Sequence, residues 1–274
     1  MCRWLAYYGA SRRIADLLYG LDHSLIDQSL HARTGSTTNG DGFGLGWYDD
    51  EGPPGLYRSV LPAWSNRNLR ELASHVRSPL FMAHVRASTG TPVQETNCHP
   101  FRRGRWLFMH NGAIRDHASL RRALLFAVDP ELFSSIEGST DSELMFHLAL
   151  TFGLGDDPLP ALARMVGHVE RTAAEHGIVA PLQMTVCLSD GKCVWGVRYA
   201  SAGTPPSLYV SREARALREL YPRIEPLEYL SDEDRVIVSE PLVDLPGAWI
   251  PVREGTAVVL RAGPDRIERF VPAE

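Results

Sequence analysis

The stretch G-S-T-D-S-E-L-M-F-H-L-A-L-T-F-G, residues 138–153, carries the clearest helix start in the chain. Thr140 and Glu143 have the Thr-x-x-Glu spacing of a capping box, in which the two residues satisfy free backbone N–H groups at a helix N-terminus. An apolar run from Leu144 to Leu148 follows directly. We therefore expect a helix that begins after Thr140 and holds Asp141 in its first turn.

Outward from this helix, periodic patterns predict helices close by and strands toward both ends. Gly177 is a suitable residue just past the end of the last predicted helix. The predicted helices cover residues 66–76, 119–126 and 159–176. The predicted strands cover residues 3–8, 42–48, 56–61, 80–85 and 105–109 before the helices, and 182–188, 193–199, 208–210, 235–238, 256–260 and 266–270 after them. This segregated order favours an α+β fold of mostly antiparallel sheets covered by helices, in a single domain spanning residues 1–274.

The composition is that of an ordinary globular protein, with 274 residues, 44% hydrophobic and 22% charged. A formal net charge of -5 provides no basic field, so we do not expect nucleic-acid binding. Charged residues interrupt the first thirty positions, and no later stretch has eighteen uninterrupted apolar residues. Neither a secretory signal nor a membrane span is therefore expected, and the chain is predicted to be cytoplasmic.

Two of the four cysteines, Cys187 and Cys193, flank an Asp-Gly pair at 190–191. That pair is typical of a two-residue type I′ hairpin turn, which would place Cys187 opposite Val194 and Leu188 opposite Cys193. The two thiols would then face opposite sides of the sheet. A disulfide between them is disfavoured, and the cysteine usage fits a reduced cytosolic protein.

Cys2 lies where removal of Met1 would expose it as the first residue. Its new α-amino group would have a pKa near 8, while an ordinary thiol has a pKa of about 8.5. One residue would then supply both a nucleophile and the base that activates it. The alternative is a second-position cysteine that is there by chance.

The segment H-V-R-A-S-T-G, residues 84–90, follows an apolar run and predicts a strand that ends in a turn. Arg86 would then lie at the end of a sheet, where its planar guanidinium can bind a carboxylate through two hydrogen bonds. The alternative is a surface ion pair.

His110, Asn111 and Gly112 follow a further predicted strand. The Asn111 amide and the Gly112 N–H are plausible donors to a developing oxyanion, although Asn-Gly is also a common turn pair. Asp141 has two interpretations as well. An acidic residue in a first helical turn is favoured by the helix dipole, and the same carboxylate can bind an ammonium group.

Three further patterns resemble functional motifs without meeting their requirements. The glycine-rich run 40–46 lacks the context of a phosphate loop and predicts a strand packed tightly against a neighbour. Cys98 and His99 are adjacent, so in an extended chain they point to opposite faces rather than forming a nucleophile–base dyad. A zinc site built from Cys98 and histidines 84, 99 and 110 would have an unusual ligand spacing. We expect neither a metal ion nor a cofactor.

Taken together, the motifs resemble the class II glutamine amidotransferases of the N-terminal-nucleophile hydrolase superfamily. The matching segments are M-C-R at 1–3, H-V-R-A-S-T-G at 84–90, N-C-H-P-F at 97–101, F-M-H-N-G at 108–112 and G-S-T-D-S-E at 138–143. The segment V-I-V-S-E-P-L, residues 236–242, is similar to a stand-alone branch that includes γ-glutamyl hydrolases of ergothioneine synthesis and of glutathione breakdown. The resemblance implies a four-layer αββα sandwich.

The resemblance also implies the role of each site residue. Cys2 would be the nucleophile, and Asn111 with the Gly112 N–H would form the oxyanion hole. Arg86 would bind the substrate α-carboxylate and Asp141 its α-ammonium.

Thr89 would lie beside the two substrate-binding charges. Together these roles predict an amidohydrolase that cleaves the γ-glutamyl amide bond of glutamine or of a γ-glutamyl compound. No acceptor domain follows the motifs, which favours a small-molecule substrate without a partner. Two alternatives remain open: a glutaminase subunit that delivers ammonia to a partner synthase, and a catalytically silent module that binds a γ-glutamyl metabolite. A homo-oligomer is compatible with each of them.

Overall fold

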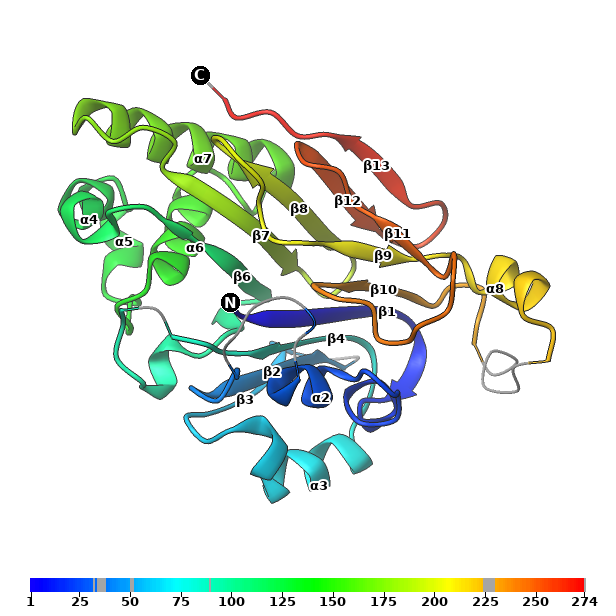
Figure 1. Cartoon of the computed structure of the whole chain (residues 1–274). Coiled ribbons are helices and arrows are strands. Elements are labelled where there is room, and N and C mark those ends of the chain that lie inside the picture. The colour runs from blue at the N-terminus through cyan, green and yellow to red at the C-terminus, as the bar shows by residue number, and fades with distance from the viewer. Residues whose placement is uncertain (32, 34–37, 50–51, 89, 224–229, 274) are drawn as a thin grey trace.

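The computed structural model describes residues 1–31, 33, 38–49, 52–88, 90–223 and 230–273. Two antiparallel sheets lie face to face in the middle of the molecule, with helices on their outer sides (Figure 1). The first sheet has the strand order β11-β9-β10-β1-β4-β2-β3, and the second β13-β12-β8-β7-β6-β5. The strands of the first sheet are β1 (Arg3–Arg13), β2 (Phe43–Tyr48), β3 (Gly55–Ser59), β4 (Arg77–Val85), β9 (Tyr209–Ser211), β10 (Arg235–Val238) and β11 (Trp249–Pro251). Those of the second are β5 (Phe101–Arg103), β6 (Trp106–Ile114), β7 (Leu182–Ser189), β8 (Val194–Ala200), β12 (Thr256–Leu260) and β13 (Arg266–Arg269).

Each sheet has its own helical cover. Helices α1 (Ala15–Leu18), α2 (Leu25–Leu30) and α3 (Arg67–His75) share an apolar core with the outer face of the first sheet. Helices α4 (His117–Phe126), α6 (Asp141–Thr151) and α7 (Pro158–Glu175) share a core with the outer face of the second. The short helices α5 (Pro130–Phe133) and α8 (Ala214–Leu220) and two 3-10 turns, Ala63–Ser65 and Glu95–Asn97, complete the elements.

The third core lies between the sheets and depends on the alternation of side chains along each strand. On β1, Leu5 and Tyr7 belong to the core under the helices, whereas Trp4 and Ala6 belong to the core between the sheets. The predicted four-layer αββα sandwich is therefore confirmed.

At the start of α6, only one of the two hydrogen bonds of the predicted capping box forms. Thr140 Oγ1 accepts a hydrogen bond of 3.1 Å from Glu143 N, as expected for an N-cap residue. The Glu143 carboxylate, however, accepts from Glu137 N at 2.9 Å and Gly138 N at 2.7 Å instead of from the N-cap backbone. The predicted return contact is thus wrong, because the preceding segment folds over the first turn and offers two other donors.

The glycine-rich strand β2 packs as tightly as predicted. A Cβ atom at Gly44 would lie 2.0 Å from His99 O, and one at Gly46 would lie 2.6 Å from a methyl group of Leu107. These approaches bring the first sheet close to the second.

The predicted hairpin register at 190–191 is wrong by two residues. Ser189 pairs with Val194 and Cys187 with Gly196, so four residues form the connection. Asp190 Oδ1 accepts hydrogen bonds from the backbone N–H groups of Lys192 and Cys193, at 2.8 and 2.9 Å, which favours the longer turn. All four cysteines have free thiols.

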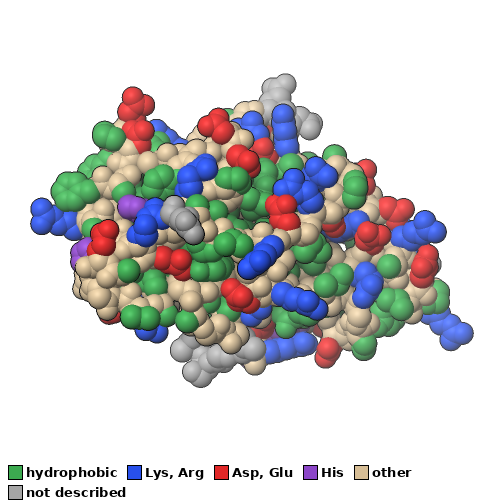
Figure 2. All heavy atoms as spheres, turned by 90° about the horizontal axis from the view of Figure 1, so that it is seen from above, with side chains coloured by type: hydrophobic (Ala, Val, Ile, Leu, Met, Phe, Trp, Pro, Cys, Tyr) green, Lys and Arg blue, Asp and Glu red, His purple; other side chains and the backbone are tan. Residues whose placement is uncertain are grey.

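The chain surface mixes both signs of charge. On the face shown in Figure 2, basic side chains alternate with acidic ones instead of gathering into one patch. None of the helices within the described ranges combines the length and apolar character needed to cross a bilayer.

Candidate active site

Cys2 directly precedes β1, at one end of the space between the sheets. Its Sγ atom lies 3.4 Å from Ala87 N, which donates to it, and 3.5 Å from Ala87 O. Burial raises the pKa of the Cys2 thiol, while the Ala87 N–H, the N-terminal amine and the Arg86 and Arg3 guanidinium groups act in the opposite direction. The balance keeps the group a neutral thiol at rest, so a base is needed to activate it.

Arg86 follows β4 directly and is only 3% exposed, so it is not a surface ion pair. The following turn holds its guanidinium group, because Nη2 donates to Thr91 Oγ1 at 2.7 Å and to Ser88 Oγ at 3.1 Å. Nη1 donates to Asp41 O at 3.3 Å. The arginine is therefore fixed in orientation next to the residue that contacts Cys2. Thr89, predicted to lie beside it, is outside the described residues.

Asn111 and Gly112 lie within β6 rather than in a turn, since the strand continues to Ile114. The turn interpretation of Asn-Gly is therefore wrong. Gly112 has a φ of 147°, and a Cβ atom there would lie 1.9 Å from Gln183 O on the neighbouring strand. Only glycine fits this position, both for its backbone angle and for the approach of β7.

Asp141 connects the first turn of α6 to the end of β6. Its Oδ2 atom accepts from Ile114 N at 2.8 Å, and its Oδ1 atom accepts from Ser142 N at 2.7 Å and from Ser142 Oγ at 3.1 Å. The carboxylate is thus bonded to the backbone three residues beyond Asn111, at the end of the same strand.

Three buried hydrogen bonds connect the two halves of the site, and two of them run from one sheet to the other. Trp4 Nε1 donates to Thr185 Oγ1 at 3.2 Å, and Thr185 Oγ1 in turn donates to Asn111 O at 3.4 Å. His84 Nε2 contacts His110 O at 3.2 Å. The segments that carry Cys2 and Arg86 are thereby tied to the segment that carries Asn111.

The histidines next to the motif residues act as neutral supports. A carbonyl oxygen only accepts, so His84 carries its hydrogen on Nε2, and burial lowers its pKa to about 3. His110 Nδ1 lies 2.8 Å from Ser142 Oγ, the hydroxyl that also contacts Asp141. Both histidines lie in motifs that the sequence shows, but their contacts depend on pairing between distant strands.

The alternative nucleophile does not form a dyad. Cys98 Sγ contacts Ser59 O at 3.5 Å and Gln94 O at 3.7 Å, while the His99 ring stacks on His84 with 4.2 Å between ring centroids. Burial raises the pKa of Cys98 to about 11, so it stays a thiol. Over the described part of the chain, no group of three or more His, Cys, Asp or Glu side chains is placed to hold a metal ion.

The stacked antiparallel sheets, their two helical covers and a second-position cysteine beside the sheet ends define an N-terminal-nucleophile-type amidotransferase fold. The family model described as "Glutamine amidotransferases class-II" matches residues 19–272. The chain belongs to this family and is an enzyme of the class II glutamine amidotransferase type.

Curated relatives include hydrolases of γ-glutamyl compounds. A probable glutamine amidotransferase of Saccharomyces cerevisiae is 34% identical over 295 aligned positions, which cover 95% of this chain and 82% of that one. The γ-glutamyl-hercynylcysteine sulfoxide hydrolase of Mycolicibacterium smegmatis is 34% identical over 176 positions, covering 63% of this chain and 72% of that one.

Solved structures share the whole fold. A glutamine aminotransferase class-II domain protein from Silicibacter pomeroyi superposes with a TM-score of 0.76 at 34% identity, with full coverage of both chains. The glutamine phosphoribosylpyrophosphate amidotransferase of Bacillus subtilis superposes with a TM-score of 0.63 at 17% identity, covering 98% of this chain and 49% of that one. The second likeness concerns the fold alone.

Proposed function

We propose that this enzyme hydrolyses a γ-glutamyl amide bond through a γ-glutamyl thioester on Cys2. The supporting observation is the placement of the Cys2 thiol against Ala87, the residue that follows Arg86. Asn111 O is linked through Thr185 to Trp4, two residues after Cys2. A nucleophile, a carboxylate-binding cation and an amide donor thus come from three distant segments of the chain.

The zwitterionic end of the substrate is bound by opposite charges. The turn holds Arg86 in one orientation, so little side-chain entropy is lost when it binds the α-carboxylate. An ionised carboxylate offers about four acceptor positions, and Asp141 uses three of them within the chain. Among the described residues the remaining one has no hydrogen-bond partner, and we assign it to the α-ammonium group. Thr89 completes this proposed binding site.

The reaction then needs a single base. With Met1 removed, the α-amine of Cys2 takes the thiol proton while Sγ attacks the γ-carbonyl carbon. Asn111 Nδ2 and Gly112 N stabilise the resulting oxyanion by hydrogen bonds. Collapse breaks the C–N bond, the amine returns the proton to the leaving nitrogen, and water then hydrolyses the thioester to release glutamate.

The leaving group is proposed to be larger than ammonia. This expectation is supported by the relative from Mycolicibacterium smegmatis, which is named a γ-glutamyl-hercynylcysteine sulfoxide hydrolase. We expect the best γ-glutamyl amide to have a kcat/KM at least about tenfold above that of glutamine. This difference corresponds to about 1.4 kcal/mol of extra transition-state binding from the leaving group.

A panel of γ-glutamyl amides tests the proposal. The purified protein is incubated with glutamine, γ-glutamyl amino acids, glutathione and γ-glutamyl thioether sulfoxides, and the released glutamate and amines are identified by mass spectrometry. Cys2→Ala should abolish turnover and leave the fold intact, whereas Cys98→Ala is the matched cysteine control and should stay active.

Two results would contradict the proposal. Turnover by Cys2→Ala would exclude the thioester. If glutamine were the best substrate of the panel and an added synthase raised its turnover, the enzyme would be an ammonia donor instead.

A further inference from the structure

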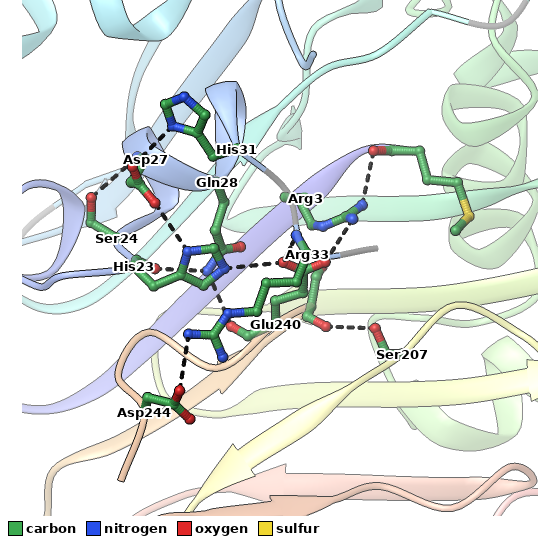
Figure 3. Close-up of polar contacts among 12 residues, drawn as sticks. Arg3, His23, Ser24, Asp27, Gln28, His31, Arg33, Ser207, Glu240 and Asp244 are labelled. Atoms are coloured by element: carbon green, nitrogen blue, oxygen red, sulfur yellow. Dashed lines mark hydrogen bonds and ion pairs between the residues drawn. The ribbon is translucent and has the colours of Figure 1, made fainter. Parts of the chain in front are cut away.

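Arg3 folds back onto the main chain of the candidate nucleophile. Its side chain is buried, and Nη1 donates hydrogen bonds of 2.9 Å to both Met1 O and Cys2 O. Nη2 donates to Glu240 Oε1 at 2.7 Å. Figure 3 shows the Arg3 side chain next to the Glu240 carboxylate, with a dashed line between them. One side chain thus connects the Cys2 backbone to a residue 237 positions away.

Glu240 is itself held from several sides. Its Oε2 atom lies 3.2 Å from His23 Nε2 and accepts from Arg33 N at 3.2 Å. Its backbone oxygen accepts from Gln28 Nε2 at 3.2 Å. Figure 3 shows these groups converging on Glu240 from the segment that includes α2. The carboxylate therefore has little freedom to move away from Arg3.

The contacts continue one step further along α2. His23 Nδ1 lies 3.0 Å from Asp27 Oδ2, so both ring nitrogens of His23 face carboxylate oxygens. The result is a continuous set of polar contacts from Asp27 through His23 and Glu240 to Arg3 and the Cys2 carbonyl. Burying such charges gives little net stability, because their desolvation offsets most of the attraction. Stability alone is thus a poor explanation for the set.

We propose that Arg3, held by Glu240, is a positioning residue for hydrolysis, which fixes the Cys2 backbone and places a positive charge beside the amine exposed when Met1 is removed. This inference rests on the proposed function, since it assumes that Cys2 is the nucleophile. A nearby cation disfavours a protonated amine, so Arg3 keeps more of the base in its neutral, active form. After Met1 is removed, the remaining contact with Cys2 O also limits the positions that the thiol can take.

The charged groups around this site come from several elements. Arg86, after β4, adds a second positive charge near the Cys2 thiol. Asp41 accepts from Arg86 Nη1 through its backbone oxygen at 3.3 Å, and its Oδ2 atom accepts from Ser88 N at 2.7 Å. The groups behind Arg3 are Glu240, His23 and Asp27. A matched ion pair lies further along the same strand, where Arg12 Nη2 contacts Asp234 Oδ2 at 2.7 Å and Asp234 is buried.

The test compares Arg3→Gln, Arg3→Lys, Glu240→Gln and the control Arg12→Gln. For each protein, the pH dependence of kcat/KM is measured, together with the pH dependence of Cys2 alkylation by iodoacetamide. Arg3→Gln should lower kcat by about tenfold or more and raise the apparent pKa of the acidic limb by roughly one unit. Glu240→Gln should lower that apparent pKa, because the positive charge of Arg3 is then less neutralised.

Arg3→Lys should keep the wild-type apparent pKa of the acidic limb, since the charge remains. It should lose part of kcat, because an ammonium group does not hold Cys2 O and Glu240 in the fixed geometry of the guanidinium group. Arg12→Gln should lower the melting temperature without changing the apparent pKa of the acidic limb. The proposal would be overturned if the apparent pKa stayed unchanged in Arg3→Gln, or if Arg12→Gln raised it by the same amount. If Arg3→Gln does not fold, the opposite shift in Glu240→Gln decides, and its absence counts against the role of Arg3. Alkylation of Cys2 needs no substrate, so it tests the role of Arg3 even in a protein without hydrolase activity. A failure to hydrolyse γ-glutamyl amides would contradict the proposed function and not the role of Arg3.

Discussion

Trp4 Nε1 donates a hydrogen bond of 3.2 Å to Thr185 Oγ1, across the space between the two sheets. Thr185 Oγ1 in turn donates a hydrogen bond of 3.4 Å to Asn111 O, and both Trp4 and Thr185 are fully buried. The strand that begins beside Cys2 is thus joined by side chains to the strand that carries the proposed oxyanion donors. This bridge joins the two halves of the site, together with the contact between His84 and His110 O.

Thr185→Val should weaken both stability and catalysis. Valine has a similar shape but leaves the buried Trp4 N–H without an acceptor, which costs about 1–3 kcal/mol of unfolding free energy. We expect kcat to fall while KM stays close to the wild-type value, since the substrate-binding charges are untouched. Urea unfolding and steady-state kinetics provide the measurements. Thr185→Ser keeps the hydroxyl and should recover most of kcat, and failure to recover it would argue against the hydrogen bond.

Arg86→Lys and Asn111→Ala should have different kinetic signatures. The lysine variant replaces a planar group by a point charge, so KM should rise more than kcat falls. The alanine variant removes one oxyanion donor, so kcat should fall by about a hundredfold or more with a smaller change in KM. Steady-state kinetics on the best γ-glutamyl substrate separates the two effects. Identical patterns in both variants would show that the assigned roles are wrong.

Gly112→Ala should prevent the native pairing of β6 and β7. The added Cβ atom would lie 1.9 Å from Gln183 O, at a φ of 147° that side chains other than glycine rarely adopt. We expect a loss of at least about 2 kcal/mol in unfolding free energy, together with loss of activity. Gly104→Ala is the control, because Gly104 has a positive φ of 55° but no neighbouring atom within 4 Å. Equal losses of unfolding free energy in both variants would mean that backbone strain, and not the close approach of Gln183 O, causes the effect.

The buried histidines predict a loss of stability in mild acid. Burial lowers the pKa of His84 to about 3 and that of His99 well below its ordinary value. The unfolded chain therefore binds protons first as the pH falls below about 6.5, and stability is lost between that pH and the folded-state pKa. At pH 5 the loss is about 2 kcal/mol for each histidine that stays neutral in the folded state.

His99→Phe isolates one of these contributions. The His99 ring stacks on His84, and neither of its nitrogens has a hydrogen-bond partner among the described residues, so an apolar ring suits the site. We expect the difference in unfolding free energy between pH 7 and pH 5 to shrink by about 2 kcal/mol, with no loss at pH 7. Urea titrations at both pH values measure it. An undiminished difference would show that His99 takes up a proton in the folded state.

Local patterns predicted much of the fold. The capping residue of α6 and the Gly177 stop after α7 are local signals, and both were correct. Helices α1 and α2 were missed because they are short, at 4 and 6 residues, and have no long apolar period. The extension of β6 through Asn111 was also missed. Its pairing with β7 outweighs the turn preference of Asn-Gly, and no pattern near residue 111 indicates that partner.

In the candidate site, the individual residues could be predicted from the sequence, but the contacts between distant residues could not. Cys2, Arg86, Asn111, Gly112 and Asp141 could be named because each lies in a short motif. Arg3 and Glu240 also lie in such motifs, yet their pairing could not be derived. Nothing in a single sequence connects two residues 237 positions apart, whereas the antiparallel pairing of β1 with β10 brings them together.

The α-amine of Cys2 should be the base, so activity should require that Cys2 be the first residue. Met1 is 53% exposed, and a second residue as small as cysteine permits removal of the initiator methionine. A peptide bond to any preceding residue converts the amine into an amide, which cannot take the thiol proton near neutral pH. The raised pKa of the buried thiol makes this loss severe, because few molecules ionise without a base.

A variant with an N-terminal extension, which ends at a protease site directly before Cys2, tests this requirement. We expect the extended protein to be folded but inactive, and cleavage to restore full turnover while intact mass shows Cys2 at the N-terminus. The same protease treatment of an extended Cys2→Ala variant is the control and should restore nothing. Full activity before cleavage would show that another group takes the proton, and the proposed mechanism would then be wrong.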